Sequence, residues 1–357
     1  MPNGKVGLIT ASAVVIAMST YNNLPASEVE DLELNNKWKL NWKSKLGLYS
    51  KYHEWKAKNK GKLLRKYRSR TKRLRAFLSS IKAKARAKGR KIILKLNRFA
   101  DMDEDDVMYT IADFLANSTE LSKTFPMNLL EDAVEASINW WDTGPQEPVA
   151  DQGWCGSSWA SNTVQIASFI YERALKKKLS FSTQQLVDCV SPYAGCRNGA
   201  YLEGFKFIVK NLLAQSSDYP YTGKPGACNF VATKIKFGVD LNYGYIEPGE
   251  ASLMRAVSVA PVASSMTLGR EVLLYDGGVF DPRGMDCGWE FKRTSILVVG
   301  YGVDAATGVK YWLLKNSWSK NWGENGYMRI IRGKFVEDGP CGLAKYPFLV
   351  DVKKKGD

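Results

Sequence analysis

The sequence predicts an α+β domain that is preceded by a separate helical region. Helix-forming residues with apolar positions at helical spacings fill residues 37–91, and a second apolar helical stripe runs from Ser158 to about Leu175. Later segments favour strands separated by Gly-rich turns, and they lie at Ile296–Tyr301, Lys310–Leu314 and Tyr327–Ile331. Helices that come first and strands that come later within one segment are typical of α+β folds.

The first 22 residues have the pattern of a signal peptide. Lys5 supplies a short basic start, residues 6–18 are mostly apolar, and Ala26-Ser27 could lie near a cleavage point. An apolar run of this length is too short to span a bilayer comfortably, and the alternative is a buried N-terminal helix. No later stretch has the length and apolarity of a transmembrane helix. We therefore expect a protein that is secreted or enters a lysosome-like secretory compartment.

The net charge of +15 is concentrated in one part of the chain. Residues 37–98 contain 24 Lys or Arg and a single acidic residue, Glu54, whereas residues 136–357 contain 25 Lys or Arg and 21 acidic residues. Such a basic run is typical of a solvated helical region, and the alternative is a segment that binds a polyanion such as a heparin-like glycan, an anionic membrane or a nucleic acid. We expect a helical region at 37–101, a linker at 102–135 and a domain at 136–357.

All cysteines lie in the C-terminal domain: Cys155, Cys189, Cys196, Cys228, Cys287 and Cys341. An even number without a Cys-x-x-Cys pair favours disulfides over zinc. The single histidine of the chain, His53, also argues against a Cys/His metal site, so neither a metal nor another cofactor is expected. One N-glycosylation sequon, Asn117-Ser118-Thr119, indicates a possible glycoprotein.

Residues 152–160 read Gln-Gly-Trp-Cys-Gly-Ser-Ser-Trp-Ala and carry the most specific motif. The motif resembles the active-site signature of the papain and cathepsin L-like cysteine peptidases, with Ser158 at the position of the nucleophilic cysteine. A second block beginning Asn316-Ser317-Trp318 resembles the asparagine-bearing motif of the family. In that motif the asparagine orients the histidine. Counting back from the strand that ends at Gly302 places Thr294 at the histidine position.

The resemblance implies roles for further residues. Gln152 would donate to the oxyanion, and Gly199 and Trp318 would line the substrate site. Spacing alone cannot choose among the possible disulfide connectivities. The resemblance implies the pairs Cys155–Cys196, Cys189–Cys228 and Cys287–Cys341. Asn97-Arg98-Phe99-Ala100-Asp101 resembles the end of the inhibitory propeptide. The implied fold is therefore the papain-like one, with a helical left subdomain and a β-barrel-like right subdomain, preceded by a helical propeptide.

The mechanism of this family needs a thiolate and an imidazole that accepts and returns a proton. Ser158 and Thr294 provide neither, so the sequence predicts an inactive homologue that binds its own propeptide and a peptide, an inhibitor or a protein in the former cleft. The alternative is a residual hydrolase in which Ser158 is the nucleophile and acts with Lys292 or a bound water. Lys292 and Arg293 together are more typical of a solvated loop, which disfavours that alternative.

Overall fold

The computed structural model describes residues 42–59, 70–103, 105–107, 123–130, 135–143, 147–190, 195–197, 199–229, 234–283, 285, 287–335 and 337–353. The expected signal peptide at 1–22 and the sequon at Asn117 lie outside these residues. Within the described part of the chain, no helix has the length and apolarity needed to cross a membrane.

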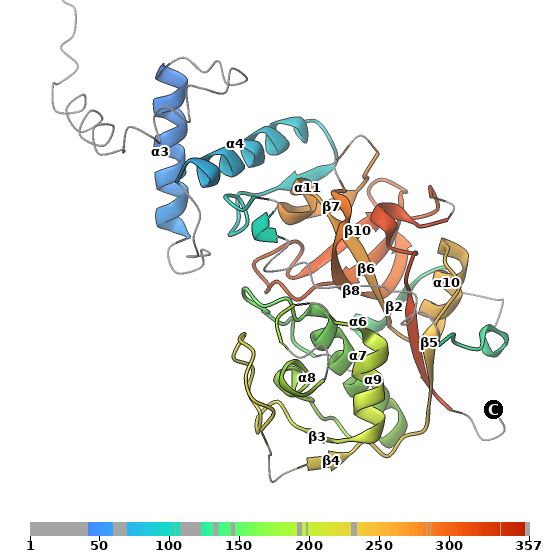
Figure 1. Cartoon of the computed structure of the whole chain (residues 1–357). Helices are drawn as coiled ribbons and strands as arrows, with labels where there is room; N and C mark the ends of the chain where they lie inside the picture. Colours follow the sequence, from blue (N-terminus) through green and yellow to red (C-terminus); the bar gives the residue numbers. More distant parts are fainter. Residues whose placement is uncertain are drawn as a thin grey trace, which may run out of the picture.

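The basic N-terminal region forms two helices and a short strand, which are α3 (Trp42–Lys58), α4 (Arg70–Arg86) and β1 (Ile92–Leu94). The two helices meet through aromatic rings, because the ring centroid of Phe77 lies 5.2 Å from that of Tyr52 and 5.1 Å from that of Trp55. Lysines and arginines cover the outer faces, as helical periodicity predicts. Figure 1 shows α3 on the outer side of α4, away from the rest of the molecule.

The first half of the C-terminal domain is helical. Its central helix is buried from Ser158 to Tyr171, as the apolar stripe predicts. Ser157 occupies the N-cap position but makes no capping hydrogen bond, and its hydroxyl instead shares a 2.6 Å hydrogen bond with that of Tyr221. The elements of this half are α6 (Trp140–Thr143), α7 (Ser158–Leu175), α8 (Thr183–Cys189), α9 (Tyr201–Lys210), β3 (Leu212–Ala214) and β4 (Lys234–Lys236).

The second half is built on one large sheet, with the order β1-β7-β10-β9-β8-β6-β11-β5 and with β2 added beside β8. All three predicted strand segments are confirmed, and the first of them is part of a longer strand, β8. The elements are β2 (Ile138–Asn139), β5 (Leu241–Tyr245), α10 (Glu250–Val259), β6 (Val262–Leu268), α11 (Arg270–Leu273), β7 (Tyr275–Phe280), β8 (Trp289–Val303), β9 (Lys310–Lys315), β10 (Tyr327–Ile331), η3 (Pro340–Gly342) and β11 (Phe348–Val352).

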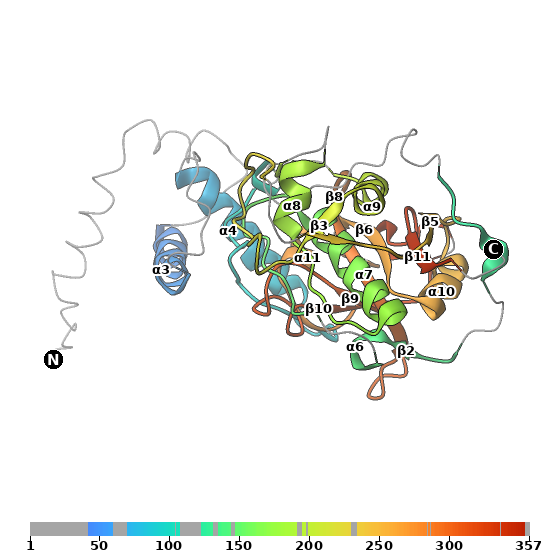
Figure 2. The same ribbon diagram turned by 90° about the horizontal axis from the view of Figure 1, so that it is seen from below.

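Figures 1 and 2 show α7, α8 and α9 gathered together, while α3 lies at the end of the molecule away from β5, α10 and the C-terminus. Helix α7 packs against β8, which brings the start of the helix to the middle of the sheet. The mixed architecture confirms the predicted α+β class with a helical part and a β-rich part.

The N-terminal region is attached to the domain through β1. Strand β1 pairs antiparallel with β7, with Ile92 opposite Gly278 and Ile93 opposite Gly277. Beyond the strand, the Asn97 side-chain amide donates to the carbonyl oxygen of Leu273 at 2.8 Å. Residues 123–130 include η2 (Met127–Leu129) and contact β5, although the sequence analysis assigned them to a linker.

Candidate active site

The candidate site lies where α7 begins against β8. Ser158 is the first residue of α7, so its hydroxyl lies at the positive end of the helix dipole. Neither Ser158 nor Thr294 has any exposed surface, both being 0 % exposed. The site is therefore closed to substrate in this form of the protein.

Two hydroxyl groups meet at the centre of the site. The Ser158 and Thr294 oxygens lie 3.1 Å apart and share a hydrogen bond in which either can donate. The Ser295 backbone N–H also donates to the Ser158 oxygen, at 3.0 Å. In a working enzyme of this type, the partner of the nucleophile must take up its proton near neutral pH. A threonine hydroxyl does not do so, and the only histidine of the chain lies on α3.

The residues around the Ser158–Thr294 pair form a connected set of hydrogen bonds. The Gln152 side-chain N–H donates to the backbone carbonyl oxygen of Cys155 at 2.8 Å, and the Gln152 side-chain amide oxygen accepts from the Ser317 hydroxyl at 2.6 Å. Asn316 follows β9, and its side-chain oxygen accepts from the Ser317 N–H at 2.8 Å. Ser317 thus joins the proposed oxyanion donor to the proposed orienting residue. Sequence reasoning missed this role, although Ser317 stands inside the quoted motif.

The two predicted substrate-binding residues are both held by packing. A Cβ atom at Gly199 would lie 2.1 Å from the Trp159 ring, so the chain needs glycine there even without a ligand. Trp318 is buried between two aromatic neighbours, with ring centroids 5.0 Å from Trp322 and 5.0 Å from Phe99. Phe99 belongs to the N-terminal region, so that region covers Trp318 in this form.

The expectation that Lys292 and Arg293 lie on a solvated loop is wrong. Both belong to β8, and their exposed fractions are 6 % and 4 %. The Arg293 guanidinium donates to the hydroxyl and the carbonyl oxygen of Ser265 at 2.9 and 2.8 Å and to the carbonyl oxygen of Gly342 at 2.6 Å. These bonds satisfy the buried charge, which explains how a strand interior accommodates an arginine.

The structure contains the three disulfides implied by the resemblance, and one of them braces the site. The Cys155–Cys196 bond ties the turn before α7 to the segment that leads to Gly199, and the Gly156 N–H donates to the carbonyl oxygen of Cys196 at 3.0 Å. The other two bonds, Cys189–Cys228 and Cys287–Cys341, lie in the helical part and at the edge of the β-rich part. The described residues contain no group of three or more His, Cys, Asp or Glu that could hold a metal ion.

A buried lysine beside the site escaped the sequence analysis. Lys315 ends β9 next to Asn316, is 4 % exposed, and donates from Nζ to the carbonyl oxygen of Glu147 at 2.5 Å. Its ammonium lies 4.9 Å from the Trp141 ring centroid. Burial lowers the pKa of Lys315 from 10.5 to about 8, and the nearby Glu147 carboxylate opposes that shift. The sequence feature that could have indicated this burial is the position of Lys315 directly after the apolar run Tyr311–Leu314.

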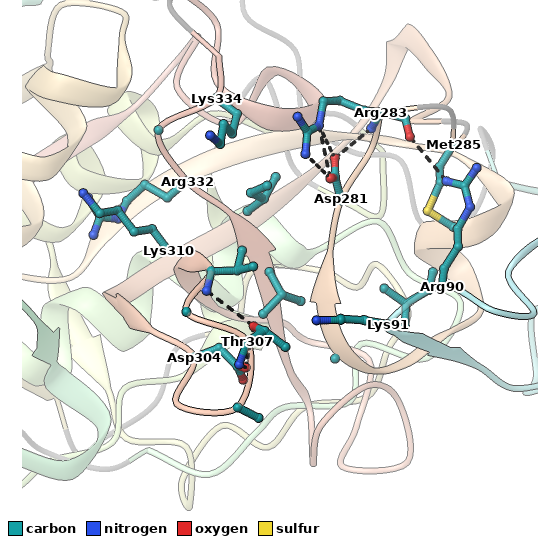
Figure 3. A pocket seen from close by; sticks show the side chains of 18 residues that line it. Arg90, Lys91, Asp281, Arg283, Met285, Asp304, Thr307, Lys310, Arg332 and Lys334 are labelled. Atoms are coloured by element: carbon teal, nitrogen blue, oxygen red, sulfur yellow. Dashed lines mark hydrogen bonds and ion pairs between the residues drawn. The ribbon is translucent and has the colours of Figure 1, made fainter.

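A pocket of about 920 Å³ lies apart from these residues, between the start of β1 and the turn after β8. Figure 3 shows that its acidic groups are already paired. Asp281 accepts from Arg283 at 2.5 Å, and the Asp304 carboxylate accepts from the Thr307 hydroxyl at 2.6 Å and from Arg329. Neither Ser158 nor Thr294 lines this pocket, so its size does not identify it as the functional site.

Comparison with known proteins supports the relationship that the motifs indicate. Residues 134–350 match the family described as papain family cysteine protease. The chain is 35% identical over 264 residues to a cathepsin L-like proteinase of Phaedon cochleariae, covering 72% of this chain and 78% of that protein. It is 37% identical over 217 residues to zingipain-2 of Zingiber officinale, covering 60% of this chain and 96% of that protein.

Solved structures of proforms also resemble the whole chain. The proform of the Amb a 11 cysteine protease, a ragweed pollen allergen, superimposes with a TM-score of 0.72 at 29% identity, covering 87% of this chain and 94% of that one. Procathepsin L 3 from the larval midgut of Tenebrio molitor gives a TM-score of 0.67 at 27% identity, covering 85% and 99%. These coverages extend the likeness to the N-terminal region.

Proposed function

The chain belongs to the papain family of cysteine proteases and carries its propeptide, and we propose that it is a secreted pseudoprotease that binds its partners without cleaving them. The observation that carries the proposal is the 3.1 Å hydrogen bond between the Ser158 and Thr294 hydroxyls. It stands where the mechanism of the family requires a thiolate beside an imidazole. Three disulfides support a secretory route, since such bonds persist in oxidising compartments.

The ligand of the former cleft would be a peptide segment, an inhibitor of this peptidase class or another protein. The preserved surroundings support this class of ligand, because Gln152, Asn316 and Ser317 keep one connected network while the proton-transfer groups are gone. In the present form the N-terminal region is the occupant nearest to the site, through Phe99 over Trp318.

The test is an assay of the secreted protein, before and after an added peptidase removes the N-terminal region, against a broad library of fluorogenic peptides. We expect no turnover above that of Ser158→Ala. The variant loses one buried hydroxyl hydrogen bond and is expected to lose about 1 kcal/mol of unfolding free energy. Turnover that disappears in Ser158→Ala would show that the site is catalytic.

A second candidate function rests on the burial of Lys292. A serine nucleophile needs a base, and Lys292 is buried on β8 two positions before Thr294, whose hydroxyl contacts that of Ser158. In this case a fluorophosphonate probe would label Ser158, and Lys292→Met would abolish the labelling. If the probe labels neither the wild type nor Lys292→Met, the result favours the pseudoprotease.

Polyanion binding by residues 37–98 is a separate proposal. A groove between α3, α4 and β1 has an apolar floor that includes Trp55 and Ile93, and lysines surround it: Lys51, Lys58, Lys84, Lys88 and Lys95. Retention of the full chain on a heparin column, and its loss when three of these lysines become glutamate, would support binding. Elution of both proteins at the same low salt would count against it.

A further inference from the structure

The large sheet has two edges, and segments that precede the cysteine-bearing domain cover both. Strand β1 covers β7 at one end, as described above. At the other end β5 pairs with β11 along one side only. Residues Lys123–Phe125 lie along its other side, where Thr124 forms a parallel bridge with Tyr245.

Main-chain hydrogen bonds join this segment to β5 in both directions. The Phe125 N–H donates to the Tyr245 carbonyl oxygen at 2.8 Å, and the Tyr245 N–H donates to the Lys123 carbonyl oxygen at 2.8 Å. Without the segment these Tyr245 groups would belong to an open sheet edge, which is prone to pair with other chains.

Side chains strengthen the attachment. Phe125 is 3 % exposed and belongs to the hydrophobic core of the domain. The Lys123 ammonium lies 3.2 Å from the ring centroid of Tyr243, a cation–π contact with the same strand. The segment is therefore anchored by the buried ring of Phe125 and by the cation–π contact of Lys123.

The next residues are held from α10. Arg255 donates from its guanidinium to the carbonyl oxygen of Leu130 at 2.9 Å and to that of Met127 at 3.4 Å. Leu130 is 6 % exposed, so its side chain also lies in the core. The attachment thus continues from Lys123 to Leu130.

The segment approaches β5 closely at Gly244, where no side chain is present. A Cβ atom there would lie 2.6 Å from the Thr124 carbonyl carbon, 2.7 Å from the Lys123 oxygen and 2.7 Å from the Phe125 nitrogen. Backbone atoms cannot move aside as a flexible side chain can, so any larger residue at position 244 would displace the segment.

We propose that Lys123–Leu130, named here the edge segment, is a permanent part of the peptidase domain, and that proteolytic processing of the N-terminal region falls before Lys123. Cleavage at the expected domain boundary near residue 136 would remove a core phenylalanine and open the β5 edge. Since the site lacks its catalytic pair, the peptidase that performs the cut is a separate protein.

The test is limited proteolysis of the folded full chain, read by N-terminal sequencing and intact mass. The sequence makes trypsin a sharp probe, because no Lys or Arg lies between Arg98 and Lys123 or between Lys123 and Arg173. We expect the persistent C-terminal fragment to begin at Phe99 or earlier. A persistent fragment that begins at Thr124 would overturn the proposal.

A glutamate-specific peptidase probes the other end of the edge segment. We expect the persistent fragment to begin at Leu121 or earlier, after a cut at Glu120 or an upstream site. Fragments that begin at Asp132 or Ala136 would show that the edge segment is removed with the N-terminal region, and would overturn the proposal.

Two variants test the cause of the protection. Phe125→Ala and Gly244→Ala are each expected to speed tryptic cleavage after Lys123 by about 10-fold or more, because they release the edge segment locally. The matched control is Phe237→Ala, which removes a phenylalanine that is 2 % exposed in the helical part and contacts Tyr171 and Phe181 instead. An equal effect of the control would show global loosening and would contradict the proposal, and the wild-type fragments remain decisive if a variant fails to fold.

Discussion

The proposed centre and the surface that receives the N-terminal region are held together by different kinds of contact. At the proposed centre, two neutral hydroxyls share a hydrogen bond. At the docking surface, the Arg98 guanidinium makes two bonds to the Asp151 carboxylate at 3.0 and 2.8 Å, and Arg86 pairs with the buried Glu271 at 2.8 Å. Charged pairs therefore hold the N-terminal region against the domain, whereas uncharged groups meet at the proposed centre.

A buried ion pair also lies within the N-terminal region. Arg73 donates to the Asp101 carboxylate at 3.1 Å, and the Tyr52 hydroxyl donates to the same oxygen at 3.1 Å. Burial raises the pKa of Asp101 above its ordinary value, and the Arg73 guanidinium opposes that rise. A carboxylate buried in this way is costly unless its partners stay in place, so the region is built to hold one arrangement.

The largest effect is expected when a cysteine and a histidine are placed at positions 158 and 294. In Ser158→Cys/Thr294→His, an imidazolium beside the thiol and the start of α7 are expected to lower the thiol pKa far below that of an ordinary cysteine. We expect alkylation by iodoacetamide at pH 6 to be about 100-fold faster than in Ser158→Cys alone, once the N-terminal region has been cut away. The pH dependence of alkylation measures this difference.

The single variants are the controls for that experiment. Ser158→Cys alone should react with the pH profile of an ordinary thiol, and Thr294→His alone should not react at all. If the double variant keeps the profile of Ser158→Cys, the surroundings of the centre have changed too far for two substitutions to repair.

The docking surface can be weakened from within the N-terminal region. Arg73→Ala leaves the Asp101 carboxylate buried without its cation and is expected to lower the unfolding free energy by about 3 kcal/mol at neutral pH. Because protonation removes the buried charge, the loss should shrink in acid. Urea unfolding at two pH values measures both effects.

The matched control is Lys84→Ala, which removes a cation from an exposed position on the same helix. We expect a change within about 0.5 kcal/mol. The pair assignment also predicts that Arg73→Ala/Asp101→Asn is more stable than Arg73→Ala, and a double variant that is less stable would contradict it.

The last prediction concerns Lys315, beside the proposed centre, and its effect appears only in alkaline solution. The pKa of Lys315 is lowered in the folded protein, so the unfolded chain binds a proton that the folded protein does not between about pH 8 and pH 10.5. Stability from this group therefore rises with pH across that window, by roughly 3 kcal/mol in total. Lys315→Met should remove this rise.

The measurement is the difference in unfolding free energy between the wild type and Lys315→Met at several pH values, because the difference cancels titrations that both proteins share. A difference that stays constant from pH 7 to pH 10 would mean that Lys315 remains charged in the folded state.

Local pattern was sufficient for much of the fold. The apolar stripe predicted α7 from Ser158, because side-chain periodicity follows directly from helix geometry. The same reasoning failed for Lys292 and Arg293. Two adjacent cations predict solvent exposure, and only partners from distant segments, such as Ser265 and Gly342, allow Arg293 to lie inside a sheet.

The absence of a histidine after His53 was decided by the sequence alone, because no fold can supply an imidazole that the chain lacks. What Ser158 contacts was decided by the tertiary structure. Its neighbour Thr294 is 136 residues away in the chain, and the two meet only because α7 packs against β8. The same holds for the edge segment, which composition assigns to a linker and which is held by main-chain hydrogen bonds from β5 and by Arg255 of α10. Sequence fixes which chemical groups exist, whereas packing between distant segments fixes which of them touch.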